Sequence, residues 1–235
     1  MLPGRDRRVE RRRAVTGPLR HGEPWGHRAS GAPDLEIAGD DHDLADLVGR
    51  QPPPLVRFRP TPHSDLARAL GLGGDAPGTM EVAVDALAVD DPHGATAVNA
   101  VVLGRPPDRL SWTARAMAMT IAVDGRPWFT GRATTVVVAS GQFLRGADLV
   151  PRGHPGDGWA EVQVYALTRG ERRPMRRRLP TGTHVPHPRI RTGRGQRVEI
   201  EVTGRALPLE VDAREQGRAT RLAVALVAGA LRLLV

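Results

Sequence analysis

Arginine supplies most of the side-chain charge that could bind a ligand in this sequence. All 34 basic side chains are arginines, against 26 acidic ones, and the formal net charge is +8. A guanidinium group near an anionic lipid surface gains about 1 kcal/mol of attraction, and phosphates attract it similarly. Two blocks are dense enough for such binding, although solvated surface is the simpler interpretation of both. They are Arg5, Arg7, Arg8, Arg11, Arg12 and Arg13, and then Arg172, Arg173, Arg176, Arg177 and Arg178.

The same charge does not indicate a nucleic-acid partner. A lysine-free chain is typical of a very GC-rich genome, whose codons favour Arg, Ala, Gly and Pro, so the pI near 11.3 is weak evidence for a polyanion. Aromatic residues make up 3% of the chain, too few for a platform on which bases stack. The sequence also has no helix-turn-helix, zinc-finger or RNA-binding motif. We therefore expect no nucleic-acid binding.

Residues for nucleophilic or zinc chemistry are scarce. The chain has no cysteine, which excludes disulfides, thiolate zinc sites and cysteine nucleophiles. His184 and His187 are too closely spaced for one helix face and flank a proline, so the pair indicates a turn rather than a zinc site. Ser140 follows a strand-like run but lacks an evident histidine partner, and neither a Walker A loop nor a Gly-x-Ser-x-Gly elbow occurs.

Two kinds of structure must position these residues. Residues 35–37 and 55–58 have strand-like patterns, and a short helix is expected from Asp43 onward with that residue as N-cap. Residues 64–71 predict a capped helix that ends at glycine. This order predicts a piece of α/β structure. From residue 76 onward, short Val- and Ile-rich runs between Gly, Pro and Asp turns predict an antiparallel sandwich or barrel.

The two ends of the chain have patterns of their own. Residues 1–33 combine the first arginine block with Gly, Pro and His and no apolar periodicity, which predicts a disordered basic arm. Residues 217–235 are rich in Ala, Leu and Val and predict an apolar helix packed on the fold, with membrane contact or self-association as alternatives. No apolar run reaches the roughly 18 residues that a membrane-spanning helix needs.

A series of motifs follows one order along the chain. The motifs are a strand with Ser-Gly at 135–146, Pro151, the turn Gly156-Asp157-Gly158, the turn 179–188, and strands at 197–202 and 207–212. In this order they resemble the C-terminal domain of the diacylglycerol kinase-like lipid kinases, a family that includes sphingosine kinases and is distantly related to NAD kinases. Residues 35–44 and 59–71 resemble its nucleotide motifs. The resemblance covers roughly residues 34 to 216.

The resemblance implies an α+β fold, with a C-terminal antiparallel β-sandwich preceded by a truncated, Rossmann-like α/β remnant. It also implies ATP and magnesium as cofactors. The expected ranges are a disordered Arg-rich arm at 1–33, the remnant of the nucleotide-binding domain at 34–75, the sandwich at 76–216 and the apolar helix at 217–235. The implied site residues are Gly39 and Asp41 for the nucleotide, Asp65 and Glu215 for catalysis, and Asp157 and Asp212 for the metal.

The nucleotide motifs depart from the family's pattern. The phosphate loop reads Gly-Asp-Asp-His-Asp at 39–43 where the family has Gly-Gly-Asp-Gly-Thr, so bulky side chains replace glycines that let N–H groups approach a phosphate. Pro62 removes a backbone donor from the second motif. Glu215 stands one place later than the family's base, which would turn it to the other face of a strand.

We therefore expect a diacylglycerol kinase-like lipid kinase homologue whose catalysis is weakened or absent. A non-catalytic protein that binds lipid or a partner is the alternative, and a truncated gene product is a third. The expected partner is a lipid substrate or an anionic membrane surface, and a homodimer stays open. The expected location is the cytoplasm, with peripheral contact at the inner face of the membrane.

Overall fold

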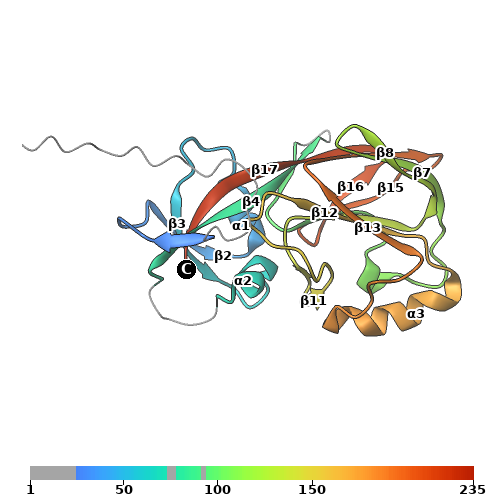
Figure 1. Cartoon of the computed structure of the whole chain (residues 1–235), viewed down its shortest axis with the longest axis horizontal. Helices are drawn as coiled ribbons and strands as arrows, with labels where there is room; N and C mark the ends of the chain where they lie inside the picture. The colour runs from blue at the N-terminus through green and yellow to red at the C-terminus, as the bar shows by residue number, and fades with distance from the viewer. Residues whose placement is uncertain (1–24, 73–77, 91–93) are drawn as a thin grey trace, which may run out of the picture.

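The structure, a computed structural model, describes residues 25–72, 78–90 and 94–235. A small α/β module and a larger β-sandwich lie end to end, and two long strands, β4 (Met80–Asp90) and β17 (Arg221–Leu234), run through both (Figure 1). None of the described helices is long and apolar enough to cross a membrane. The fold is α+β with a C-terminal sandwich, which confirms the predicted fold class.

The first layer of the sandwich is an antiparallel sheet with one face in water. Its Arg197–Thr203 strand alternates strictly, with Val and Ile buried and the charged residues exposed, as expected for such a sheet. In spatial order the strands are β1 (Gly26–Arg28), β4, β17, β14 (Arg197–Thr203), β7 (Met117–Val123) and β8 (Arg126–Ala133), with β5 (Thr96–Ala97) paired to β4.

The second layer is also antiparallel, and its central strands are buried on both faces. Two of them read Ala-Val-Val-Leu-Gly and Thr-Val-Val-Val-Ala, and every residue in them is buried. In spatial order the strands are β13 (Ile190–Gly195), β12 (Ala160–Tyr165), β9 (Thr135–Ala139), β6 (Ala100–Gly104), β15 (Leu207–Val211) and β16 (Arg214–Ala219).

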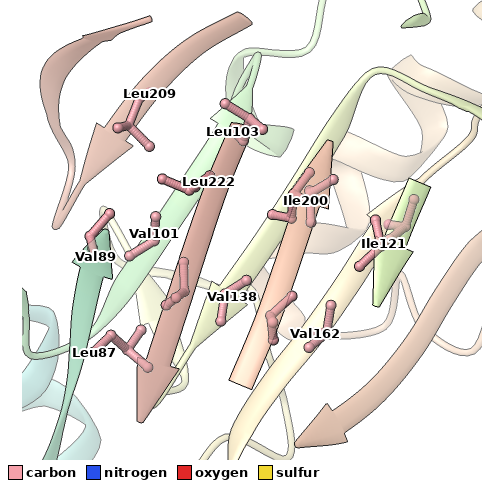
Figure 2. Close-up of a cluster of buried hydrophobic side chains, with 14 of the residues drawn as sticks. Leu87, Val89, Val101, Leu103, Ile121, Val138, Val162, Ile200, Leu209 and Leu222 are labelled. Carbon is pink, nitrogen blue, oxygen red and sulfur yellow. The ribbon is translucent and has the colours of Figure 1, made fainter. Parts of the chain in front are cut away.

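The inner core fills the space between the two layers. Figure 2 shows aliphatic side chains from both sheets pointing toward one another. Burial of this aliphatic surface is the main stabilising contribution to the sandwich. The labelled members are Leu87, Val89, Ile121, Ile200 and Leu222 from the first layer, and Val101, Leu103, Val138, Val162 and Leu209 from the second.

An outer core covers the other face of the second layer. There Tyr165 of β12 is fully buried beside Met175 and Leu179. Its hydroxyl donates to Gln163 Oε1 at 2.6 Å, which satisfies the buried polar group. The covering elements are α3 (Arg169–Arg178), 3-10 helices at Pro107–Arg109 and Leu179–Thr181, and the pair β10 (Phe143–Leu144) and β11 (Ala147–Asp148).

The α/β module is built on the far ends of β4 and β17. Its elements are β2 (Leu35–Gly39), α1 (Asp41–Ala45), β3 (Leu55–Pro60) and α2 (Asp65–Leu70). β2 pairs parallel to β3, and β3 pairs parallel to the end of β17. Its small core joins Leu44, Val56 and Leu66 to residues such as Val84 of β4 and Leu231 of β17. The predicted strand–helix–strand–helix order is confirmed.

The predicted C-terminal helix is wrong. Residues 221–234 form β17, which pairs with β14, β4 and β3. An Ala- and Leu-rich segment favours a helix by propensity, but this segment lies between partner strands, and tertiary pairing overrides propensity. Gly229 has a φ of 59°, and the register with β4 shifts between Val227 and Leu231. The glycine therefore lies in a β-bulge of β17 and supplies its positive φ.

The predicted basic arm falls largely on residues 1–24, which lie outside the described residues. Its last part is not an arm, because Gly26–Arg28 forms β1 and pairs with β4. The ranges 34–75 and 76–216 stay predictions. Both modules use β4 and β17, since Leu87 and Leu222 belong to the inner core while Val84 and Leu231 belong to the core of the module.

Candidate functional site

A cleft of about 380 Å³ lies where the α/β module meets the sandwich. Three of the residues singled out from the sequence, Asp41, Asp65 and Asp212, line it together. A larger hollow of about 760 Å³ is more open and contains none of those residues, so the cleft is the candidate site. The lining residues of the cleft are Asp40, Asp41, His42, Pro62, His63, Asp65, Arg68, Arg145, Gly146, Asp212, Ala213 and Arg214.

The start of α1 occupies the place of the predicted phosphate loop. Asp40, and not the predicted Asp43, is the N-cap, and Asp43 completes a capping box by accepting from Asp40 N at 2.7 Å. The carboxylate of Asp40 accepts in turn from His42 N at 2.9 Å. A side chain at Gly39 would collide with the Asp43 carboxylate. The glycine therefore leaves space for Asp43 to cap the start of α1.

Asp41 points from α1 to the beginning of α2. Its buried carboxylate accepts from Ser64 Oγ at 2.5 Å, from Asp65 N at 3.1 Å and from Leu66 N at 3.2 Å. Backbone N–H groups at a helix start are donors that commonly bind anions. Desolvation by burial raises the pKa of Asp41 to about 6, against the opposing effect of these hydrogen bonds.

Asp65 links α2 to the sandwich. It lies in the first turn of α2, and its carboxylate accepts from Arg145 N at 2.5 Å and from Gly146 N at 2.7 Å. Arg145 and Gly146 both have positive φ, in the tight turn between β10 and β11. Both oxygens of Asp65 are therefore engaged with the backbone of the other module.

Asp212 is buried at the turn between β15 and β16. Asp212 and Ala213 both have positive φ, as a two-residue hairpin turn requires. The carboxylate accepts from the backbone N–H groups of residues 98, 99 and 100 at 2.8, 3.0 and 2.8 Å. Burial raises its pKa to about 7, with a smaller contribution from the nearby charge of Asp41.

The guanidinium groups of the cleft differ in their partners. Arg145 pairs with Asp108 at 2.7 Å and also with Glu210, and Arg214 pairs with Asp40 at 2.7 Å. Arg68 instead lies over the ring of Phe143 at 5.7 Å. Within the part of the chain that the structure describes, Arg68 is the cleft arginine without a carboxylate partner.

Three predicted residues lie outside the cleft lining, one of them Gly39 at the end of β2. Asp157 is on the turn before β12, where its carboxylate accepts from Trp159 N at 3.1 Å and burial raises its pKa. Glu215 is an exposed residue of β16 and stands opposite Glu210 of β15. Among residues 25–72, 78–90 and 94–235, no group of three or more His, Asp or Glu side chains is arranged to hold a metal ion.

Sequence reasoning missed several cleft residues, Arg145 above all. It lies inside a motif that carried the resemblance, but its contacts to Asp65, Asp108 and Glu210 span 37 to 80 positions of sequence. His42 was also missed; its Nε2 donates to the carbonyl of Asp212 at 2.8 Å, across 170 positions. The motif resemblance pointed to the region through Asp41, Asp65 and Asp212, but it gave no signal for these two side chains.

The residues present do not fit a magnesium–nucleotide complex. The N–H donors at the start of α2 are taken by Asp41 and Ser64, and Asp40 and Asp43 cap α1. The carboxylates of Asp41, Asp65 and Asp212 each accept at least two hydrogen bonds from within the chain. Both helix starts thus hold side-chain carboxylates where a phosphate would need free donors.

Comparison with known proteins identifies the fold. Residues 109–235, more than half of the chain, match the family described as the YegS C-terminal NAD kinase beta sandwich-like domain. The chain belongs to this family. The predicted resemblance to the diacylglycerol kinase-like and NAD kinase-like proteins is therefore confirmed. No curated protein sequence gives a significant match.

Solved structures extend the likeness beyond the family domain. A diacylglycerol kinase from Bacillus anthracis strain Sterne superimposes with a TM-score of 0.65 at 17% identity, over 86% of this chain and 76% of its own. A candidate diacylglycerol kinase from the same strain gives a TM-score of 0.69 at 15% identity, with the same two coverages. At such identities the similarity shows the fold alone. The superposition covers 86% of this chain, which is more than the family match over residues 109–235.

Proposed function

We propose that this YegS-type protein is a lipid kinase homologue that binds lipid without transferring a phosphoryl group. The observation that carries the proposal is the position of the Asp41 carboxylate. It accepts from the backbone N–H groups of Asp65 and Leu66 at the start of α2, which are donors that a nucleotide phosphate would need. The chain supplies its own anion there.

The other carboxylates of the cleft support the same proposal. Phosphoryl transfer needs carboxylates that are free to hold a metal and to orient the acceptor hydroxyl. Asp65 joins α2 to the β10–β11 turn, and Asp212 holds residues 98–100 against the β15–β16 turn. Both carboxylates are therefore engaged in contacts that hold parts of the fold together.

Phosphoryl transfer is the second candidate, and one observation favours it. Asp41 and Asp212, with pKa values raised to about 6 and about 7, both line the cleft. Perturbed carboxyl groups in a cleft are typical of catalytic sites, and a pKa near neutrality suits a general base. Asp212 is nevertheless 6% exposed and already has three donors, so it is poorly placed to reach a hydroxyl of a substrate.

Titration with ATP and magnesium separates the two candidates. We expect no rise in melting temperature at millimolar nucleotide, because Asp41 occupies the N–H donors that the phosphates would need. A ligand that does not bind the folded state does not stabilise it. A parallel assay with diacylglycerol in mixed micelles should show no transfer of the terminal phosphate.

Two variants make the titration specific. Asp41→Ala removes the carboxylate at α2, and Asp46→Ala removes an exposed carboxylate at the end of α1 as a matched control. If nucleotide stabilises the wild type and Asp46→Ala but not Asp41→Ala, or if phosphate transfer is detected, the proposal is wrong and the kinase candidate is supported.

A further inference from the structure

The outer side of the sandwich carries an exposed basic stripe on α3. Arg169, Arg173 and Arg177 recur every four residues, which places them along one face of the helix. All three are exposed, whereas Met175 and Leu179 turn into the outer core. Of the described residues, none forms an ion pair with these three arginines, and the acidic residue of the helix, Glu171, pairs with Arg189 at 3.3 Å.

An exposed tryptophan lies on a loop that is bonded to the same helix. Trp112 is 69% exposed, more than any other large apolar side chain among the described residues. The loop that carries it is held to α3 by Arg172. The Nη1 of this buried arginine donates to the carbonyls of Ser111, Trp112 and Ala114 at 3.0, 2.9 and 2.8 Å. The backbone at Trp112 is therefore anchored to α3, the helix that carries the exposed arginines.

The combination of an exposed indole with unpaired arginines fits a phospholipid surface. Arginine binds phosphate oxygens and is attracted to anionic headgroups, and tryptophan favours the boundary between headgroups and acyl chains. A single indole beside a straight arginine stripe is not a stacking platform for bases, which needs several aromatic side chains along a groove. Membrane is therefore favoured over nucleic acid as the partner of this face.

We propose that the α3 face, formed by Trp112, Arg169, Arg173 and Arg177, docks on the anionic surface of a phospholipid bilayer. The arginines contact headgroup phosphates, and the indole of Trp112 inserts among the headgroups. α3 lies along the outer side of the sandwich, away from the C-terminus (Figure 1). The choice of lipid as ligand rests on the proposed lipid-binding function, but the docking does not depend on whether the cleft transfers phosphate.

Sedimentation with vesicles tests the docking. The full chain should bind vesicles of phosphatidylcholine and phosphatidylglycerol in equal parts, and bind vesicles of phosphatidylcholine alone much more weakly. The triple variant Arg169→Gln/Arg173→Gln/Arg177→Gln should partition at least about tenfold more weakly, given about 1 kcal/mol per arginine near such a surface. Trp112→Phe should remove a blue shift of tryptophan emission that the wild type shows on adding anionic vesicles.

A matched triple variant controls for net charge. Arg50, Arg126 and Arg205 are exposed arginines on other elements and lack a carboxylate partner among the described residues. Arg50→Gln/Arg126→Gln/Arg205→Gln removes the same charge and should bind nearly as the wild type does. Circular dichroism and melting curves should show all variants folded.

The outcomes separate the inference from the proposed function. If anionic vesicles bind but both triple variants weaken binding equally, the α3 face is wrong while lipid binding stands. If the wild type does not bind vesicles, both the face and the lipid-binding proposal fail, whatever the nucleotide titration shows. If single-stranded DNA competes fully with vesicles and Trp112 emission does not shift, the face is a polyanion site and the inference is overturned.

Discussion

Among the carboxyl groups that line the cleft, Asp212 has a pKa raised further than that of Asp41. It is buried with three backbone donors, and burial nevertheless raises its pKa to about 7. In the unfolded chain an aspartate titrates near pH 4. The folded protein therefore holds a proton on Asp212 at pH values where the unfolded chain has lost it.

The sign of the pH dependence follows from this difference. Between about pH 4 and pH 7 the folded state binds more protons than the unfolded state, so the contribution of Asp212 to stability decreases as pH rises. From pH 5 to pH 7 we expect a loss of roughly 2 kcal/mol in the free energy of unfolding from this group. Asp212→Asn should lack that loss, which urea unfolding at the two pH values measures for both proteins. An equal pH dependence in the two proteins would contradict the raised pKa.

At the level of elements, the side chain of Asp65 joins α2 to the β10–β11 turn. Asp65 accepts from the N–H groups of Arg145 and Gly146, and Arg145 in turn pairs with Asp108 and Glu210 of the sandwich. This chain of contacts fixes α2 of the module on the second layer of the sandwich.

Asp65→Ala should loosen that joint. Two part-buried N–H groups lose their acceptor, which costs about 1 to 3 kcal/mol of stability. Amide hydrogen exchange at Arg145 and Gly146 should become faster, while exchange in β9 and β12 should change little. Asp46→Ala, which alters the exposed aspartate that caps the C-terminal end of α1, is the control and should leave these amides unchanged. Unaltered exchange at Arg145 and Gly146 in Asp65→Ala would show that the joint has other support.

Elements with strong local signals could be predicted from the sequence. Ser64 caps α2 through Ala67 N and Gly71 ends it with positive φ, as the pattern predicts, and the alternating run 198–202 is a strand. β17 could not be predicted, because its Ala- and Leu-rich sequence fits a helix and only pairing with distant strands makes it extended.

The cleft was only partly predictable for a related physical reason. Motif resemblance selected Asp41, Asp65 and Asp212, which do converge. It could not show that their oxygens are engaged by donors from residues 64–66, 98–100 and 145–146, because those contacts depend on tertiary structure. Asp157 and Glu215, which the same motifs selected, lie elsewhere on the fold.

For the whole molecule, β4 and β17 connect the two modules, and we expect the modules to unfold as one cooperative unit. Each strand contributes side chains to the inner core at one end and to the core of the α/β module at the other. A packing defect at the module end of β17 should therefore affect the sandwich as well.

Leu231→Ala tests this coupling. Leu231 is fully buried in the core of the module, so the substitution should cost about 2 to 5 kcal/mol. Val227 of the same strand is 37% exposed, and Val227→Ala should cost less than about 1 kcal/mol. Calorimetry of Leu231→Ala should show one transition at a lower temperature. Two separate transitions, of which only one moves, would mean that the modules melt independently.

The position of β17 also constrains how the protein folds during synthesis. It lies between β4 and β14 in the first layer and also beside β3 in the module, so both cores lack a central strand until it has been made. Domains usually fold as units while the ribosome extends the chain. Until β17 is made, the inner core and the core of the module stay open, and β4 and β14 each lack a partner strand on one side. We therefore expect folding to await the synthesis of β17 and to benefit from chaperones that hold nascent β-strands apart.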